Sequence, residues 1–146
     1  MTRPPAWRLE PGAYPHHETI QTRFQDLDVL GHINNVAFAA LFESGRVRFN
    51  QAAGLARGPG HRWLVAQVVI NYLAEGNFPQ DVTISSGIGT VGTRSWQILS
   101  AAFQGGACIG TCDVVVVLSA ADGASAMPEE FRVALEGWRV REVAGD

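Results

Sequence analysis

The chain contains 146 residues, of which 47% are hydrophobic and 17% charged. This length and composition favour one folded domain over a disordered segment, because enough apolar surface is available to offset the entropy of ordering the backbone. The 11 basic and 14 acidic side chains give a formal net charge of -3, and the absence of a basic excess argues against broad binding to nucleic acid.

The N-terminal third predicts an arm, a strand and a long helix. Residues 1–17 are rich in proline and lack periodicity, so we expect a partly ordered arm ahead of a single domain over residues 18–146. Polar and apolar residues alternate over 18–24, as in a strand. Residues 36–53 contain no proline and repeat large apolar side chains at helical spacing. Asn34 or Asn35 is a suitable N-cap for this helix.

The remainder of the chain predicts a sheet. Four strands are expected, at residues 64–73, 82–88, 96–103 and 107–119. The first of them should place one face in the core and the other partly in water. Gly105-Gly106 forms a turn, and Pro128 opens a short C-terminal helix. The order predicts an α+β fold in which an antiparallel sheet of about five strands wraps one long central helix, with a free edge that favours a homodimer or homotetramer.

Cys108 and Cys112 are four residues apart within one predicted strand. Extended chain separates them by about 13 Å, beyond the limit of about 7 Å between the Cα atoms of a disulfide. We therefore expect reduced, buried thiols, which are typical of a cytoplasmic protein. The longest apolar run, at residues 114–118, is far shorter than the about 20 residues of a spanning helix, so no membrane span is expected.

A cluster of polar side chains lies between the first strand and the long helix. It comprises Asp26, Asp28, His32, Asn34 and Asn35. The start of a helix presents unpaired amides and partial positive charge, which stabilise a developing oxyanion. A carboxylate beside them can attack a carbonyl or activate water. Aspartate-rich loops also serve as caps and turns, so the pattern alone leaves a catalytic and a structural role equally open.

The same loop does not suit a metal ion. Asp26, Asp28 and Gly31 match the first, third and sixth positions of an EF-hand loop, but Leu30 and Ala37 stand where further oxygen ligands are needed. The histidines do not occur at a recognised zinc-binding spacing. We expect no metal ion in this protein.

A longer motif surrounds this cluster. It reads Arg23-Phe24-Gln25-Asp26-Leu27-Asp28-Val29-Leu30-Gly31-His32-Ile33-Asn34-Asn35 and continues with Phe38, Phe42-Glu43 and Arg46. The motif resembles the signature of the 4-hydroxybenzoyl-CoA thioesterase-like family of hotdog proteins. Weaker similarity extends to Asn71-Tyr72, residues 92–95 and Met127-Pro128. The resemblance implies a hotdog fold and hydrolysis of acyl-CoA thioesters, with coenzyme A as part of the substrate and no cofactor.

The resemblance also implies roles for individual residues. In the Asp-type members, the second aspartate of the Asp-x-Asp motif is the catalytic carboxylate, which corresponds to Asp28 as nucleophile or general base. The amide seven residues later, at Asn35, polarises the thioester carbonyl. His32 and Asn34 line or shape the same loop, His32 beside the catalytic groups and Asn34 beside the substrate. Asp26 is expected to fix the loop as a hydrogen-bond acceptor.

The pocket walls and the charges around them are less closely specified. Phe38, expected to line the substrate pocket, replaces a tyrosine that is common in the family's helix, so one hydroxyl is missing. Another branch of hotdog thioesterases uses a glutamate on the helix, which makes Glu43 the alternative base. For Glu43 we favour an ion pair with a residue such as Arg46. Arg94 and Ser95, near a predicted turn, are candidates for binding the phosphates of coenzyme A.

Two other functions stay open. Hotdog hydratases and dehydratases resemble this chain but place a histidine five residues after the aspartate, whereas four residues separate Asp28 and His32 and no proline lies between them. A non-enzymatic acyl-CoA binding module is the other alternative. The motif does not specify the acyl group or choose between coenzyme A and acyl-carrier protein.

Overall fold

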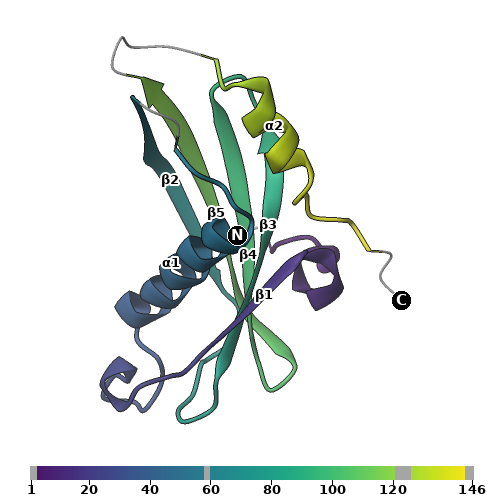
Figure 1. The fold of residues 1–146 in the computed structure, drawn as a ribbon. Coiled ribbons are helices and arrows are strands. Elements are labelled where there is room, and N and C mark those ends of the chain that lie inside the picture. The colour runs from purple at the N-terminus through teal and green to yellow at the C-terminus, as the bar shows by residue number, and fades with distance from the viewer. Residues whose placement is uncertain (1–2, 58–59, 121–125, 144–146) are drawn as a thin grey trace.

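The computed structural model describes residues 3–57, 60–120 and 126–143. Within these residues, five strands form one antiparallel sheet in the order β1-β3-β4-β5-β2, and the long helix α1 lies across one face (Figure 1). The elements are β1 (His16–Ile20), α1 (Asn35–Ala52), β2 (His61–Tyr72), β3 (Val82–Val91), β4 (Ser95–Gln104), β5 (Ala107–Ala120) and α2 (Glu129–Glu136). The predicted α+β hotdog arrangement is thus confirmed.

The helix α1 begins as the sequence predicts. Asn34 is its N-cap, and the side-chain oxygen accepts a hydrogen bond of 2.9 Å from the backbone N–H of Ala37. One face of the helix is buried against the sheet, and its members are Ala37, Phe38, Leu41, Phe42, Gly45 and Phe49. At Gly45 the helix comes so close to β3 that an added Cβ would lie 2.6 Å from the Cβ of Ile84. This close crossing holds the helix start over one end of the sheet.

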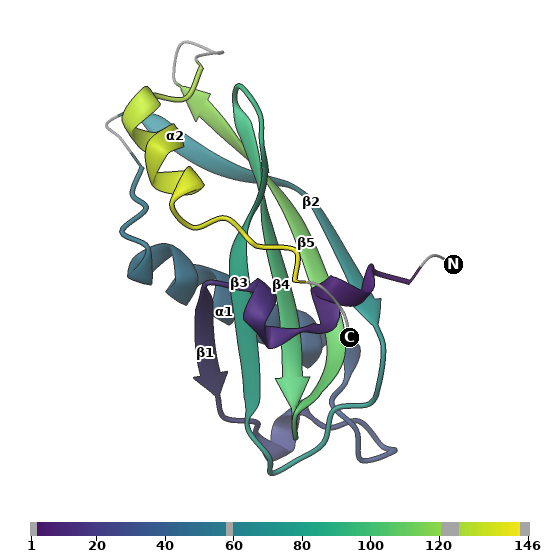
Figure 2. The ribbon, with the colours of Figure 1, turned by 90° about the vertical axis from the view of Figure 1, so that its right-hand side faces the viewer.

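The N-terminal segment differs from the expected partly ordered arm and strand. The strand β1 spans His16–Ile20 and not residues 18–24, and Phe24–Asp26 forms a 3-10 turn, η3. Before β1, the 3-10 turns η1 (Ala6–Leu9) and η2 (Pro11–Ala13) lie across the sheet face opposite α1 (Figure 2). We call residues 3–15 the N-terminal strap.

A buried arginine fixes the strap to the sheet. Arg8 is 4% exposed, and its guanidinium donates hydrogen bonds to the Asp113 carboxylate at 2.7 Å and to the Tyr14 hydroxyl at 2.9 Å. Burial acts to lower the pKa of Arg8, but these contacts outweigh it, and the pKa is raised. The proline-rich composition predicted a partly ordered arm. It could not reveal the contact with Asp113, which lies 105 positions further along the chain.

The edge strand β2 also differs from its prediction. Leu64, Val65, Val68 and Val69 are all about half exposed, so apolar side chains of both faces are open to solvent. The reason is its position: among the strands that the structure describes, β2 pairs only with β5, and α1 packs mainly on β1, β3 and β4. The expectation of one face in the core is therefore wrong for the single chain.

The remaining sequence expectations concern the cysteines and the connections. Cys108 and Cys112 are both free, and burial raises the pKa of the Cys112 thiol to about 11. Gly105 and Gly106 both adopt positive φ in the turn between β4 and β5, and Pro128 precedes α2. Among the described residues, no helix combines the length and apolar character needed to cross a membrane.

Candidate active site

The motif loop between η3 and α1 is a tight turn closed by backbone hydrogen bonds. The N–H of Asp28 donates to the carbonyl of His32 at 2.8 Å, and the N–H of Gly31 donates to the carbonyl of Asp28 at 3.0 Å. Gly31 has a φ of 81°, a left-handed conformation that side chains rarely adopt. The glycine of the motif is therefore required by the turn that presents Asp28.

The carboxylate of Asp28 has one anchored and one free oxygen. Its Oδ1 accepts hydrogen bonds from the backbone N–H groups of Leu30, at 2.9 Å, and His32, at 3.2 Å. Within the described part of the chain, Oδ2 receives no hydrogen bond, and the residue is exposed. The turn thus orients the carboxylate and leaves an oxygen available to a ligand.

The other aspartate of the motif has a structural environment. Asp26 is 4% exposed, and its carboxylate accepts hydrogen bonds at 2.9 Å from both the backbone N–H and the guanidinium of Arg23. Its carbonyl accepts from the backbone N–H and the side-chain amide of Asn34, each at 2.9 Å. These contacts agree with the loop-fixing role expected for Asp26 and tie the loop to the N-cap of α1.

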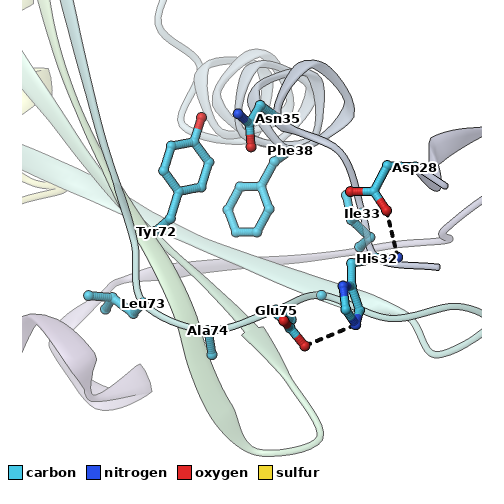
Figure 3. Close-up of a pocket in the computed structure, with 10 residues that line it drawn as sticks. Asp28, His32, Ile33, Asn35, Phe38, Tyr72, Leu73, Ala74 and Glu75 are labelled. Atoms are coloured by element: carbon cyan, nitrogen blue, oxygen red, sulfur yellow. Dashed lines mark hydrogen bonds and ion pairs between the residues drawn. The ribbon is translucent and has the colours of Figure 1, made fainter. Parts of the chain in front are cut away.

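Asp28 and the first residue of α1, Asn35, line the same cavity, whose volume is about 370 Å³ (Figure 3). The other lining residues are His32, Ile33, Phe38, Tyr72, Leu73, Ala74, Glu75 and Gly76. A second, more open hollow of about 680 Å³ also includes Asp28 and Asn35, together with Arg23 and Val36. The carboxylate and the helix start therefore border two hollows.

The loop after β2 supplies a cavity wall that the sequence motif did not reveal. Oε2 of Glu75 lies 2.9 Å from Nε2 of His32, and the carbonyl of Gly76 accepts a 2.9 Å hydrogen bond from the N–H of Ile33. An added Cβ at Gly76 would lie 2.7 Å from Cδ1 of Ile33, so the end of that side chain would have to move to admit any other residue. Tyr72 and Glu75 were missed as site residues because their distance from the motif along the chain conceals this proximity.

Several candidate residues lie elsewhere. Arg94 and Ser95 follow the turn after β3, which adjoins the segment before α2, at the end of the sheet away from the cavity (Figure 1). Glu43 is exposed on α1 and is not among the residues that line the cavity. In the described residues its expected ion pair with Arg46 does not form, and Arg48 instead approaches Glu18 at 3.5 Å. That pairing prediction is wrong.

Metal binding has no structural support in the described ranges. No three side chains of His, Cys, Asp or Glu within residues 3–57, 60–120 and 126–143 come together as a metal-binding group.

Comparisons of the sequence and the fold with known proteins identify the superfamily of this chain. The model of the thioesterase-like superfamily matches residues 22–135, and the chain belongs to that superfamily. The PA5185 protein of Pseudomonas aeruginosa strain PAO1 is similar in structure, with 28% identity, a TM-score of 0.77, and coverage of 90% of this chain and 96% of that one. A thioesterase superfamily protein of Jannaschia sp. CCS1 shows 30% identity and a TM-score of 0.72 over 84% of this chain and 81% of that one.

A more distant structure shares the fold. It is a thioesterase of Thermus thermophilus complexed with coenzyme A and zinc, with 23% identity and a TM-score of 0.75 over 86% of this chain and 95% of that one. No curated protein matches the sequence.

Proposed function

We propose that the protein hydrolyses acyl-CoA thioesters to a free acid and coenzyme A, with Asp28 as the catalytic carboxylate. The observation that carries this proposal is the environment of Asp28, whose Oδ1 is held by two amides, whose Oδ2 has no hydrogen bond from any residue that the structure describes, and which lines the same cavity as the start of α1. Membership of the thioesterase-like superfamily supports the reaction class.

The proposed chemistry uses the carboxylate and the helix start together. The thioester carbonyl oxygen accepts a hydrogen bond from the backbone N–H of Asn35, where the helix dipole stabilises the oxyanion of the tetrahedral intermediate. Asp28 either attacks the carbonyl carbon, giving an anhydride that water then opens, or removes a proton from an attacking water. Collapse of the intermediate breaks the carbon–sulfur bond and releases the thiolate of coenzyme A. The reaction needs no cofactor.

Coenzyme A as the carrier has support from the Thermus thermophilus thioesterase, which is complexed with it. Within one chain, Arg94 and Ser95 lie at the end of the sheet away from Asp28. We propose a homodimer in which the β2 strands of two copies pair antiparallel and bury their exposed valines. The partner's β2 then runs in the opposite direction, which brings the end that carries its Arg94 and Ser95 toward the Tyr72 end of this chain.

The test of the reaction is thiol release from a panel of acyl-CoAs that varies in chain length and ring content. We expect Asp28→Asn to lower kcat by at least about a thousandfold, because the amide neither attacks nor accepts a proton. Glu43→Gln is the matched control, since it removes the alternative carboxylate on α1 and should retain activity. Unchanged circular dichroism and melting temperature would show that both variants fold.

Four results would contradict the proposal. Full activity in Asp28→Asn would show that Asp28 is not the catalytic carboxylate. Loss of activity in Glu43→Gln alone would assign that role to Glu43 on α1. Hydration of crotonyl-CoA without thiol release would indicate a hydratase. Tight binding of acyl-CoAs without turnover across the panel would indicate a binding module. The cytoplasmic location stays a prediction, to be checked by cell fractionation.

A further inference from the structure

The cavity beside Asp28 contains a phenol hydroxyl for which the motif provides no role. Tyr72 is the last residue of β2, and its ring packs edge-on against Phe38 with a centroid distance of 5.4 Å and an interplanar angle of 68°. The residue is 50% exposed, and among the described residues its hydroxyl has no hydrogen-bond partner. A tyrosine held by its ring with an open hydroxyl is suited to contact a ligand.

The ring position of Tyr72 is fixed from two sides. On the sheet, Tyr72 pairs with Gly110 of β5, and the adjacent Asn71 donates a 3.3 Å hydrogen bond to the hydroxyl of Thr111. A Cβ at Gly110 would lie 2.9 Å from Cε1 of Phe38, so the glycine makes room for the Phe38 ring against which Tyr72 packs. The backbone register and the aromatic contact together limit where the hydroxyl can lie.

The hydroxyl is directed toward the start of α1. In Figure 3, the Tyr72 ring rises from the end of β2 and its oxygen points toward the first turn of the helix, where Asn35 lies, while Asp28 borders the same cavity on the other side of Phe38. The hydroxyl and the helix start thus face a common space. A carbonyl oxygen placed there can accept hydrogen bonds from both groups.

We propose that the Tyr72 hydroxyl donates a hydrogen bond to the thioester carbonyl oxygen, as a second donor beside the backbone N–H of Asn35. This role rests on the proposed thioesterase function and adds a catalytic residue to it. A phenol hydroxyl can donate this hydrogen bond while Asp28 acts on the carbonyl carbon or on the attacking water. A second fixed donor lowers the energy of the oxyanion more than that of the uncharged carbonyl.

The discriminating variant is Tyr72→Phe, which removes the hydroxyl and keeps the ring against Phe38. Binding is measured by calorimetry with two analogues that cannot be hydrolysed. One is a ketone in which a methylene group replaces the thioester sulfur and the carbonyl is retained, and the other is an S-alkyl-CoA thioether without the carbonyl. We expect Tyr72→Phe to weaken ketone binding about three- to tenfold and to leave thioether binding unchanged.

Kinetics provide a second readout of the same hydroxyl. For an acyl-CoA substrate we expect Tyr72→Phe to lower kcat at least about tenfold with little change in KM, because the lost bond is strongest in the transition state. Tyr14→Phe is the matched control, since Tyr14 is the other tyrosine of the chain and its hydroxyl bonds Arg8 on the opposite sheet face. This control should lower the melting temperature while leaving the ratio of ketone to thioether affinity unchanged.

The outcomes separate the two proposals. Equal weakening of both analogues, or no change in either, would overturn the role of Tyr72, as would kcat equal to that of the wild type. Suppose that Tyr72→Phe selectively weakens binding of the ketone and that the wild-type protein releases no thiol from any acyl-CoA. These results together would support the carbonyl contact and reject hydrolysis. Thiol release that survives intact in Tyr72→Phe would reject the contact and leave hydrolysis standing.

Discussion

Two aspartates in one short motif have opposite environments. Asp26 is buried and its carboxylate is bonded by Arg23, whereas Asp28, two residues later, is exposed and has one oxygen that no residue of the described ranges bonds. The residues alone predicted a carboxylate beside a helix start but did not say which one. Only the family resemblance selected Asp28, since burial and hydrogen bonding depend on neighbours that the motif does not encode.

The buried thiol of Cys112 predicts a loss of stability at high pH. Burial raises its folded-state pKa from the ordinary 9.0 to about 11, while Arg46 opposes the shift. Above pH 9 the unfolded chain loses this proton first, so stability is present at neutral pH and declines as the pH rises toward 11. The decline attributable to this thiol should be on the order of 2 kcal/mol.

Urea unfolding at pH 7, 9 and 10.5 measures this decline. Cys112→Ala should be less stable at pH 7, because it removes a buried side chain, but its stability should fall less steeply above pH 9. Some slope will remain, since burial also raises the pKa values of Cys108 and Tyr14. An identical slope in wild type and variant would contradict the assignment to Cys112.

At the scale of elements, the contact between α1 and β3 depends on a glycine in the helix. Gly45 lies within the helix, where alanine is ordinarily more favourable by about 1 kcal/mol. Its Cβ, however, would overlap Ile84, a fully buried residue of β3. We expect Gly45→Ala to destabilise the fold by about 1–3 kcal/mol despite its better helix propensity.

Thermal and urea unfolding check this expectation. Gly12→Ala is the control, because no atom lies within 4 Å of an added Cβ there and the glycine does not have positive φ. Its stability should stay close to that of the wild type. A stabilised Gly45→Ala protein would show that the helix can move away from β3 at little energetic cost.

The sequence predicted best those elements in which apolar residues recur at one regular spacing. The long helix began within one residue of its predicted start because Asn34 and the apolar spacing agree. Predictions for β1 and β2 were weaker. Whether a strand with alternating polar and apolar residues is buried depends on its position in the sheet. The residues of β2 do not reveal the crossover that places this strand at an edge.

At the scale of the whole molecule, β2 predicts assembly. Half-exposed apolar side chains along an unpaired edge are expected to be covered in a stable protein, and a second copy provides a matching edge. Val68→Lys, near the middle of the strand, should shift the mass measured by light scattering from dimer to monomer, because it places a charge in the proposed interface.

Val133→Lys is the matched control, since Val133 is an exposed residue of α2, outside the proposed contact. It should leave the mass unchanged. A dimeric Val68→Lys protein would exclude the β2 interface. If the partner's Arg94 binds the phosphates of coenzyme A, monomeric Val68→Lys should also show a raised KM for acyl-CoAs, with Arg94→Ala in the dimer raising it similarly.

The strap has a consequence for the order in which the protein is made. Arg8 and Asp113 are 105 positions apart in sequence. During synthesis, therefore, Arg8 leaves the ribosome long before its carboxylate partner exists and must wait until β5 has emerged. Until then this guanidinium can stay hydrated, and the outer face of the sheet has no strap to cover it. The strap thus reaches its final place only after β5, which follows it by about a hundred residues, has been made.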